Sequence, residues 1–115
     1  MFQRFFGSND TQTGAPSDVD VTQAQQLKQE GAQLIDVREP SEFAAGHAKG
    51  ARNIPLSQIS NRMKEIRTDG TVLVICQSGS RSKAAQGLLK RQNVADVRNV
   101  KGGTSAWRAA KLPLE

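Results

Sequence analysis

The chain has 115 residues, of which 37% are hydrophobic, and a formal net charge of +5 at pH 7. This length supports one domain with a modest core. The basic residues are scattered and no aromatic side chains are interleaved with them, so we expect no nucleic-acid-binding surface. No apolar stretch is long enough to span a membrane, and the single cysteine excludes an intramolecular disulfide. These features are typical of a cytoplasmic protein.

The N-terminal residues differ in composition from the rest of the chain. Phe2, Phe5 and Phe6 are followed by a polar stretch without the apolar side chains that offset the entropy cost of ordering. We predict a flexible N-terminal tail over residues 1–17 and one folded domain over residues 18–115. The three phenylalanines are compatible with packing on the domain, with a partner or with a membrane surface.

Beyond the tail, short apolar segments alternate with segments that have helix signals. Strands are predicted at residues 19–21, 33–37, 51–54, 71–75 and 96–100. Helices are predicted from a capping box at Thr22–Gln25 to before Gly31, from Pro40 to Gly46, from Ser57 toward Ile66, over 82–90, and from Gly102-Gly103-Thr104 onward. This alternation predicts an α/β fold with about five strands in a mostly parallel sheet and helices on both faces.

The most apolar run of the chain ends at its single cysteine. Residues 71–75 have the composition of a strand buried on both faces, and Cys76 opens a segment of small residues that ends at Arg81. We call residues 76–81 the cysteine loop. A thiol at the carboxyl end of a central strand, facing the next helix, lies where open α/β sheets bind ligands. The helix amides, a backbone nest in the loop and the Arg81 cation would all favour a thiolate there.

A cysteine at a strand end has a simpler explanation as a small buried hydrophobic side chain. The Ser-Gly-Ser-Arg stretch favours the catalytic interpretation, because an ordinary connection between a strand and a helix does not need it. The length of the cysteine loop then separates two kinds of chemistry. Cysteine-dependent phosphatases place one residue more between the nucleophile and the arginine, and they need a general acid that we do not find near this loop.

Four motifs occur in order along the chain. They are residues 34–39 (LIDVRE), 46–55 (GHAKGARNIP), 76–82 (CQSGSRS) and 102–107 (GGTSAW). With these motifs the chain resembles the single-domain rhodaneses, a family of sulfurtransferases, from about residue 19 to residue 113. The resemblance implies a rhodanese-like fold with a five-stranded parallel sheet flanked by helices.

The resemblance also implies a mechanism and a set of site residues. Cys76 would take a sulfane sulfur from thiosulfate or a thiol persulfide as an enzyme persulfide, and would pass it to a thiol or to cyanide. Arg81 would act with Cys76 as a catalytic residue. The donor would be bound by the rest of the motif: Gln77, Ser78, Gly79, Ser80, Arg81 and Ser82. Many relatives carry a basic residue directly after the cysteine, whereas this chain has Gln77, so a thiol persulfide is as compatible as thiosulfate.

Four other residues have chemistry that needs an explanation. Asp36 and Arg38 follow the second predicted strand, and we expect a buried ion pair or bonds that brace the loop, with a direct role toward the substrate as the alternative. His47 is expected to fix a turn, and Trp107 to belong to the core. One histidine and one cysteine do not make a metal site, so we expect neither a metal nor another cofactor.

The expected partners are small. They are an anionic sulfur donor and a thiol or cyanide acceptor, and a protein acceptor is compatible with the same site. Two alternatives stay open at this point. One is a rhodanese-like binding module without turnover, and the other is a phosphatase or arsenate-reductase type of oxyanion enzyme.

Overall fold

The computed structural model describes residues 17–115, so all but the last residue of the predicted tail lies outside the described residues. Within residues 17–115 the strands form one five-stranded sheet in the order β1-β5-β4-β2-β3, and each neighbouring pair is parallel. The strands are β1 (Asp18–Val19), β2 (Gln33–Asp36), β3 (Arg52–Asn53), β4 (Val72–Ile75) and β5 (Val97–Val100). The predicted α/β fold with a parallel sheet is confirmed.

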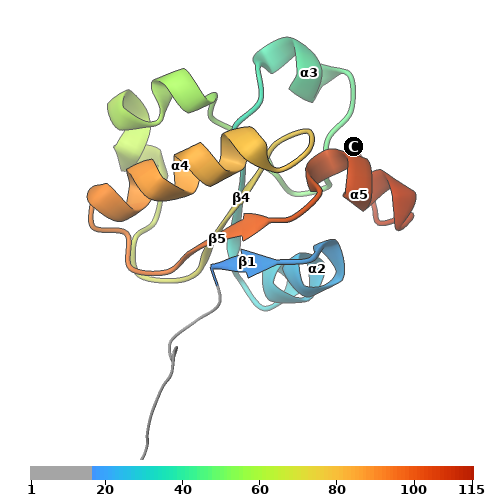
Figure 1. The fold of residues 1–115 in the computed structure, drawn as a ribbon, viewed down its shortest axis with the longest axis horizontal. Coiled ribbons are helices and arrows are strands. Elements are labelled where there is room, and N and C mark those ends of the chain that lie inside the picture. The colour runs from blue at the N-terminus through green and yellow to red at the C-terminus, as the bar shows by residue number, and fades with distance from the viewer. Residues whose placement is uncertain (1–16) are drawn as a thin grey trace, which may run out of the picture.

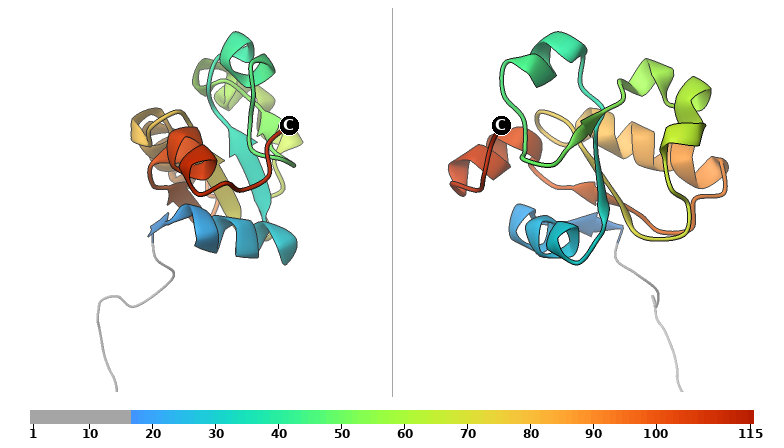
Figure 2. Two further views of the ribbon diagram at one scale, coloured as in Figure 1. Left: turned by 90° about the vertical axis from the view of Figure 1, so that its right-hand side faces the viewer. Right: turned by 180° about the vertical axis from the view of Figure 1, so that it is seen from behind.

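Helices cover both faces of the sheet, as Figures 1 and 2 show. The helices are α2 (Val21–Gln29), α3 (Pro40–Ala44), α4 (Ser80–Arg91) and α5 (Gly103–Ala109), with 3₁₀ segments η1 (Leu56–Gln58) and η2 (Ser60–Glu65). One face packs against α4, η1 and η2, and the other against α2 and α5. None of the helices in residues 17–115 is both long enough and apolar enough to cross a membrane.

The central strand β4 shows how the sequence produces these two layers. Successive side chains of a strand point to opposite faces of the sheet. Val72 and Val74 therefore pack toward α4, together with Cys76, whereas Leu73 and Ile75 pack on the other side against Trp107 of α5. Each such side chain is fully enclosed, and its burial contributes about 1.5–3 kcal/mol to folding.

The first helix begins earlier than predicted. Asp20 is its N-cap, and the capping box joins Asp20 to Gln23: the Gln23 amide donates to Asp20 Oδ1 at 2.8 Å, and the Asp20 amide donates to Gln23 Oε1 at 2.9 Å. The prediction at Thr22–Gln25 was wrong by two residues. The aspartate carboxylate is as good a cap as a hydroxyl, and the early start buries Val21 against the sheet.

The helix predicted from Ser57 toward Ile66 is also wrong. Instead of one α-helix the structure has η1 and η2, and Arg62 inside η2 leaves the helical conformation with φ −120° and ψ 25°. The Arg62 guanidinium bonds to Gln58 and to Glu65 across this break. The two tight segments still bury the side chains of Ile59 and Ile66 against the sheet.

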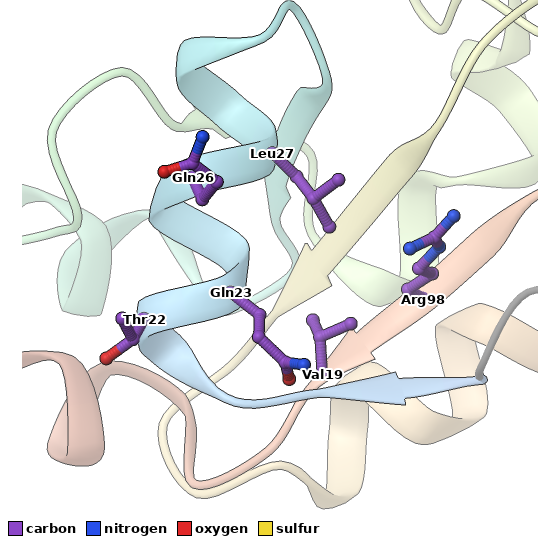
Figure 3. A pocket seen from close by; sticks show the side chains of 6 residues that line it. All are labelled: Val19, Thr22, Gln23, Gln26, Leu27 and Arg98. Carbon is purple, nitrogen blue, oxygen red and sulfur yellow. The ribbon is translucent and has the colours of Figure 1, made fainter.

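An apolar hollow lies between α2 and the edge of the sheet (Figure 3). Its volume is about 400 Å³, and its lining consists of Val19, Thr22, Gln23, Gln26, Leu27 and Arg98. None of these residues belongs to the cysteine loop. The Cys76 thiol and this hollow are therefore separate features of the molecule.

Candidate active site

The cysteine of the predicted loop lies directly after β4, the central strand of the sheet. The residue is only 1% exposed, so a reacting group must be small enough to reach an almost enclosed sulfur. Two donors point at Sγ: the Gly79 amide at 3.0 Å and the Ser82 hydroxyl at 3.3 Å. The thiol is thus the centre of a cluster of hydrogen-bond donors.

The helix that follows the cysteine starts closer to it than predicted. We expected the helix to begin at residue 82, but α4 begins at Ser80, with Gly79 as its N-cap. Gly79 has φ +111°, a left-handed conformation that glycine adopts readily, and it makes the sharp turn that the early start requires. Ser80, Arg81 and Ser82 consequently form the first helical turn, and the amides of Gly79 and Ser82 at this positive end of the helix dipole face the sulfur.

These donors change the acidity of the Cys76 thiol. Burial opposes ionisation and is the largest single influence, but the Ser82 hydroxyl and the amides of Ser82, Gly79 and Ser78 together outweigh it. The net result is a pKa of Cys76 below its usual range. The thiolate is therefore stabilised by neutral dipoles that are fixed before any substrate arrives.

The Ser82 hydroxyl is shared among three acceptors. Its oxygen lies 3.3 Å from Cys76 Sγ, 3.2 Å from the Gly79 carbonyl oxygen and 2.5 Å from Asn99 Oδ1. A hydroxyl has one proton, so it donates to one of these at a time. Asn99 belongs to β5 and is buried, and sequence reasoning missed it. A polar residue inside a buried strand was the available signal.

The first amides of α5 bind carbonyl oxygens of the cysteine loop. The Thr104 amide donates to the Cys76 carbonyl oxygen at 2.8 Å, and the Ser105 amide donates to the Gln77 carbonyl oxygen at 3.1 Å. In a trans peptide the carbonyl and the next N–H point in opposite directions. The amides of Gln77 and Ser78 are therefore turned away from α5. Gly103 makes this contact possible, because a Cβ there would lie 2.4 Å from the Cys76 carbonyl oxygen.

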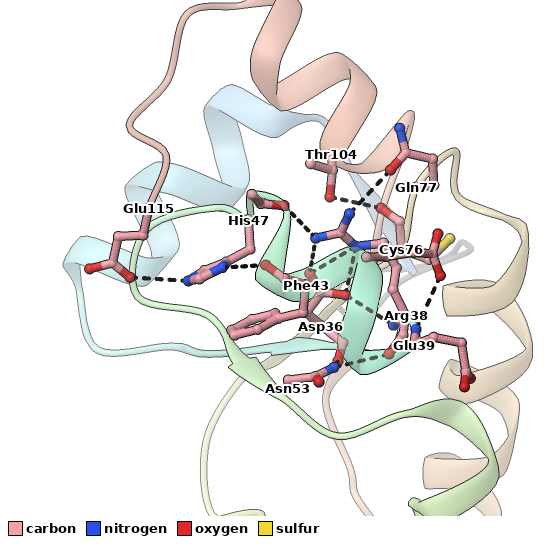
Figure 4. Close-up of polar contacts among 12 residues, drawn as sticks. Asp36, Arg38, Glu39, Phe43, His47, Asn53, Cys76, Gln77, Thr104 and Glu115 are labelled. Carbon is pink, nitrogen blue, oxygen red and sulfur yellow. Dashed lines mark hydrogen bonds and ion pairs between the residues drawn. The ribbon is translucent and has the colours of Figure 1, made fainter.

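The structure pairs Asp36 with Arg38 in a buried ion pair, at 2.8 Å between Arg38 Nη2 and Asp36 Oδ2 (Figure 4). Arg38 Nη1 also donates to Gln77 Oε1 at 3.2 Å. The side-chain Nε2 of Gln77 in turn donates to Ser105 Oγ at 2.8 Å. Asp36 therefore holds Arg38, and Arg38 in turn holds the side chain of Gln77, the residue directly after the cysteine.

Arg81, the last residue of the cysteine loop, is paired with a carboxylate of another helix. Its guanidinium forms a two-point ion pair with Glu42 of α3, at 2.7 Å from Nη1 to Oε1 and 2.9 Å from Nη2 to Oε2. Arg81 lowers the pKa of Glu42 to about 2, so this carboxylate is charged at neutral pH. Sequence reasoning placed Glu42 in the first turn of a helix but missed the pair, because the two residues are 39 positions apart and only the fold brings them together.

His47 links two segments beside α3. Its Nδ1 lies 2.9 Å from the Phe43 carbonyl oxygen, its Nε2 lies 3.4 Å from Glu115 Oε1, and its ring stacks on Phe43 with centroids 3.6 Å apart. These contacts, drawn in Figure 4, give the imidazole a structural task. In the part of the chain that the structure describes, no group of three or more His, Cys, Asp or Glu residues is arranged to hold a metal ion.

Comparisons with known proteins agree with this architecture. The sequence profile of the Rhodanese-like domain family matches residues 20–110. The chain is 53% identical over 76 residues to the uncharacterized protein YqhL of Bacillus subtilis, a match that covers 66% of this chain and 60% of that protein. It is 40% identical over 82 residues to the thiosulfate sulfurtransferase GlpE of Pseudomonas putida, covering 71% of this chain and 74% of the relative.

A solved structure shows the same arrangement of strands and helices. A rhodanese-related protein from Thermoplasma volcanium superposes with a TM-score of 0.79 at 27% sequence identity. The superposition covers 87% of this chain and 98% of the other.

Proposed function

Since the chain belongs to the Rhodanese-like domain family, we propose that it is a sulfurtransferase that carries a sulfane sulfur on Cys76. The observation that carries this proposal is the convergence of hydrogen-bond donors on the one thiol of the chain. The lowered pKa of Cys76 supports it, because the thiolate is the reactive form of cysteine.

The reaction has two steps. First, the Cys76 thiolate attacks the outer sulfur of thiosulfate or of a thiol persulfide. A new S–S bond forms on Cys76, the S–S bond of the donor breaks, and its electron pair leaves on sulfite or on the donor thiolate. Second, an acceptor thiolate or cyanide attacks the outer sulfur of the persulfide and restores the Cys76 thiolate. This is covalent catalysis with ping-pong kinetics.

The residues around the sulfur have separate tasks in these steps. The amides of Ser78 and Gly79 and the Ser82 hydroxyl stabilise negative charge on the thiolate and on the persulfide. Arg81 interacts with the Cys76 thiolate through its positive charge, which the ion pair with Glu42 partly offsets. Asp36 and Arg38 position Gln77 and do not touch the reacting atoms.

The proposed partners are a small anionic donor and a thiol or cyanide acceptor, or a protein that presents such a thiol. No metal or other cofactor takes part in the proposed steps. The cytoplasmic location stays a prediction from the single cysteine.

A phosphatase mechanism fits the site less well than sulfur transfer. Such an enzyme needs a general acid for its leaving group. Glu42, which contacts Arg81 of the cysteine loop, is the carboxylate to consider as this general acid. Its pKa of about 2 keeps it ionised, so it has no proton to give at neutral pH. The binding-module alternative has one observation in its favour, the 1% exposure of Cys76.

The intact mass of the protein tests the proposal. The protein is incubated with excess thiosulfate and, separately, with excess glutathione persulfide. We expect a reducible gain of about 32 Da, one sulfur atom, that is absent in the Cys76→Ser variant. Because the chain has one cysteine, a gain that is reducible and absent in Cys76→Ser reports on this residue. No gain from either donor would refute sulfur transfer and favour the binding module.

A further inference from the structure

The two arginines at the cysteine loop are both paired with carboxylates of the same chain. Arg38, which contacts Gln77, is held by Asp36 at 2.8 Å. Arg81, in the first turn of α4, is held by Glu42 through both of its terminal nitrogens. The negative charge of the thiolate is consequently supported by neutral donors, while both of these arginines are matched by an anion.

This charge balance matters for the choice of donor. Thiosulfate is a dianion, and its leaving group, sulfite, has two negative charges beside the sulfur that is transferred. An organic persulfide leaves as a thiolate with one charge on the corresponding sulfur. A second charge needs a cation with free donors, as in the two-point recognition of oxyanions by arginine. Glu42 occupies those donors on Arg81 and adds a negative charge of its own.

We propose, on the basis of the sulfurtransferase function above, that Glu42 is a specificity-determining residue that selects organic persulfides over thiosulfate by occupying Arg81. The position directly after the cysteine fits this selection, because Gln77 donates a hydrogen bond but brings no charge to the site.

The step with the selected donor is balanced without another reactant. The Cys76 thiolate attacks the outer sulfur of R–S–SH, and a Cys76 S–S bond forms. The S–S bond of the donor breaks, and its electron pair leaves on RS⁻. The persulfide proton arrives on Cys76–S–SH and is released to water. No oxidation or reduction beyond the exchange of the two S–S bonds takes place.

The Glu42–Arg81 pair is placed to act on a substrate at the surface of the protein. Its side chains are 33% and 38% exposed, so the pair is open to solvent and to an incoming ion, unlike the buried Asp36–Arg38 pair. The low pKa of Glu42, about 2, keeps its charge throughout the neutral range. The same pair also joins α3 to α4. If its role were only structural, removing it would change the rate of sulfur loading by the same factor for every donor.

The test measures the rate at which each donor adds sulfur to Cys76 in the wild type and in Glu42→Gln. Glutamine keeps the oxygen that accepts from the Glu39 amide at 3.1 Å, so the start of α3 is preserved while the charge is removed. The matched control is Glu39→Gln, which removes one negative charge from the same helix start. Among the ion pairs of residues 17–115, Arg81 is bound by Glu42 and not by Glu39.

We expect Glu42→Gln to raise the loading rate with thiosulfate about three- to fivefold, the scale of an exposed charge pair. Loading by glutathione persulfide should change less than about twofold, and Glu39→Gln should leave the ratio of the two rates unchanged. An unchanged ratio in Glu42→Gln, or an equal fall with both donors, would overturn the proposal. Failure of both donors to load the wild type would instead refute the sulfurtransferase function itself.

Discussion

The helices α4 and α5 begin in the same way but use their N-termini differently. Each starts after a glycine in the left-handed conformation, Gly79 with φ +111° and Gly102 with φ +75°, and neither has a side-chain cap. The amides at the start of α4 face the sulfur of Cys76, which is an anion in its thiolate form. The amides at the start of α5 instead bond the carbonyl oxygens of Cys76 and Gln77.

The comparison shows that the same backbone feature, a helix N-terminus, contacts the cysteine sulfur at α4 and holds the backbone of the cysteine loop at α5. A helix N-terminus offers unpaired N–H groups, and what they bind depends on which atoms the fold brings there. At α4 the bound atom is the cysteine sulfur, so its donors set the acidity of the thiol. At α5 the bound atoms belong to the backbone, so its donors set the shape of the loop. Changes at the two helix starts should therefore have different signatures.

The largest effect is expected at the start of α5. In Gly103→Ala a Cβ would lie 2.4 Å from the Cys76 carbonyl oxygen and 2.6 Å from the Gln77 carbonyl oxygen, and φ is +59°. The loop and α5 must then move apart, so we expect turnover to fall more than about tenfold and the melting temperature to drop by several degrees. The control is Gly70→Ala, where nothing lies within 4 Å. Wild-type turnover in Gly103→Ala would contradict the supporting role of α5.

A smaller and more specific effect is expected at the start of α4. Gly79→Ala places a side chain at φ +111°, at a cost of about 1–2 kcal/mol, and disturbs the amide that donates to Cys76 Sγ. Gly31→Ala is a close match, because Gly31 has φ +108° and open space around it. We expect similar losses of stability in denaturant for both variants. The pKa of Cys76 should rise only in Gly79→Ala, and a rise in both would contradict the account.

The most local of the three effects is expected for Ser82→Ala. The variant removes one donor from Cys76 Sγ and leaves the buried Asn99 without its hydroxyl partner. The pKa of Cys76 should rise, because the hydrogen bond from Ser82 stabilises the thiolate and is missing in the variant. The free energy of unfolding should fall by about 1–3 kcal/mol, because a buried polar group loses its partner. Rates of donor loading against pH give the first quantity and urea unfolding gives the second. Ser80→Ala, in the same helical turn but exposed, should change neither.

Much of this architecture was predictable because it depends on local patterns. The apolar runs at residues 33–37 and 71–75 contain the central strands, and Gly102-Gly103 marks the start of α5. The resemblance of the four motifs to the rhodaneses is confirmed by the family match over residues 20–110. The position of Cys76 at the carboxyl end of β4 follows from the same pattern.

The parts that sequence reasoning missed depend on contacts between distant residues. The early start of α4 depends on the left-handed conformation of Gly79, which the sequence permits but does not require. The Glu42–Arg81 pair and the bond from Ser82 to Asn99 each join elements that only the sheet order brings together. The break in η2 lies at Arg62, whose guanidinium bonds to Gln58 and Glu65 on either side of it, and no local pattern in the sequence marks this position.

The acidity of Cys76 is the most direct test of the account, whose central statement is that fixed neutral donors outweigh burial at this thiol. The ultraviolet absorbance of the thiolate is measured against pH, with the Cys76→Ser variant as the blank. The chain has no tyrosine, so no tyrosinate absorbs in the alkaline range, and the method does not require a reagent to reach a buried sulfur. We predict a midpoint below about 8.5, the value of an ordinary cysteine. A midpoint at or above that value would show that burial prevails and would contradict the account.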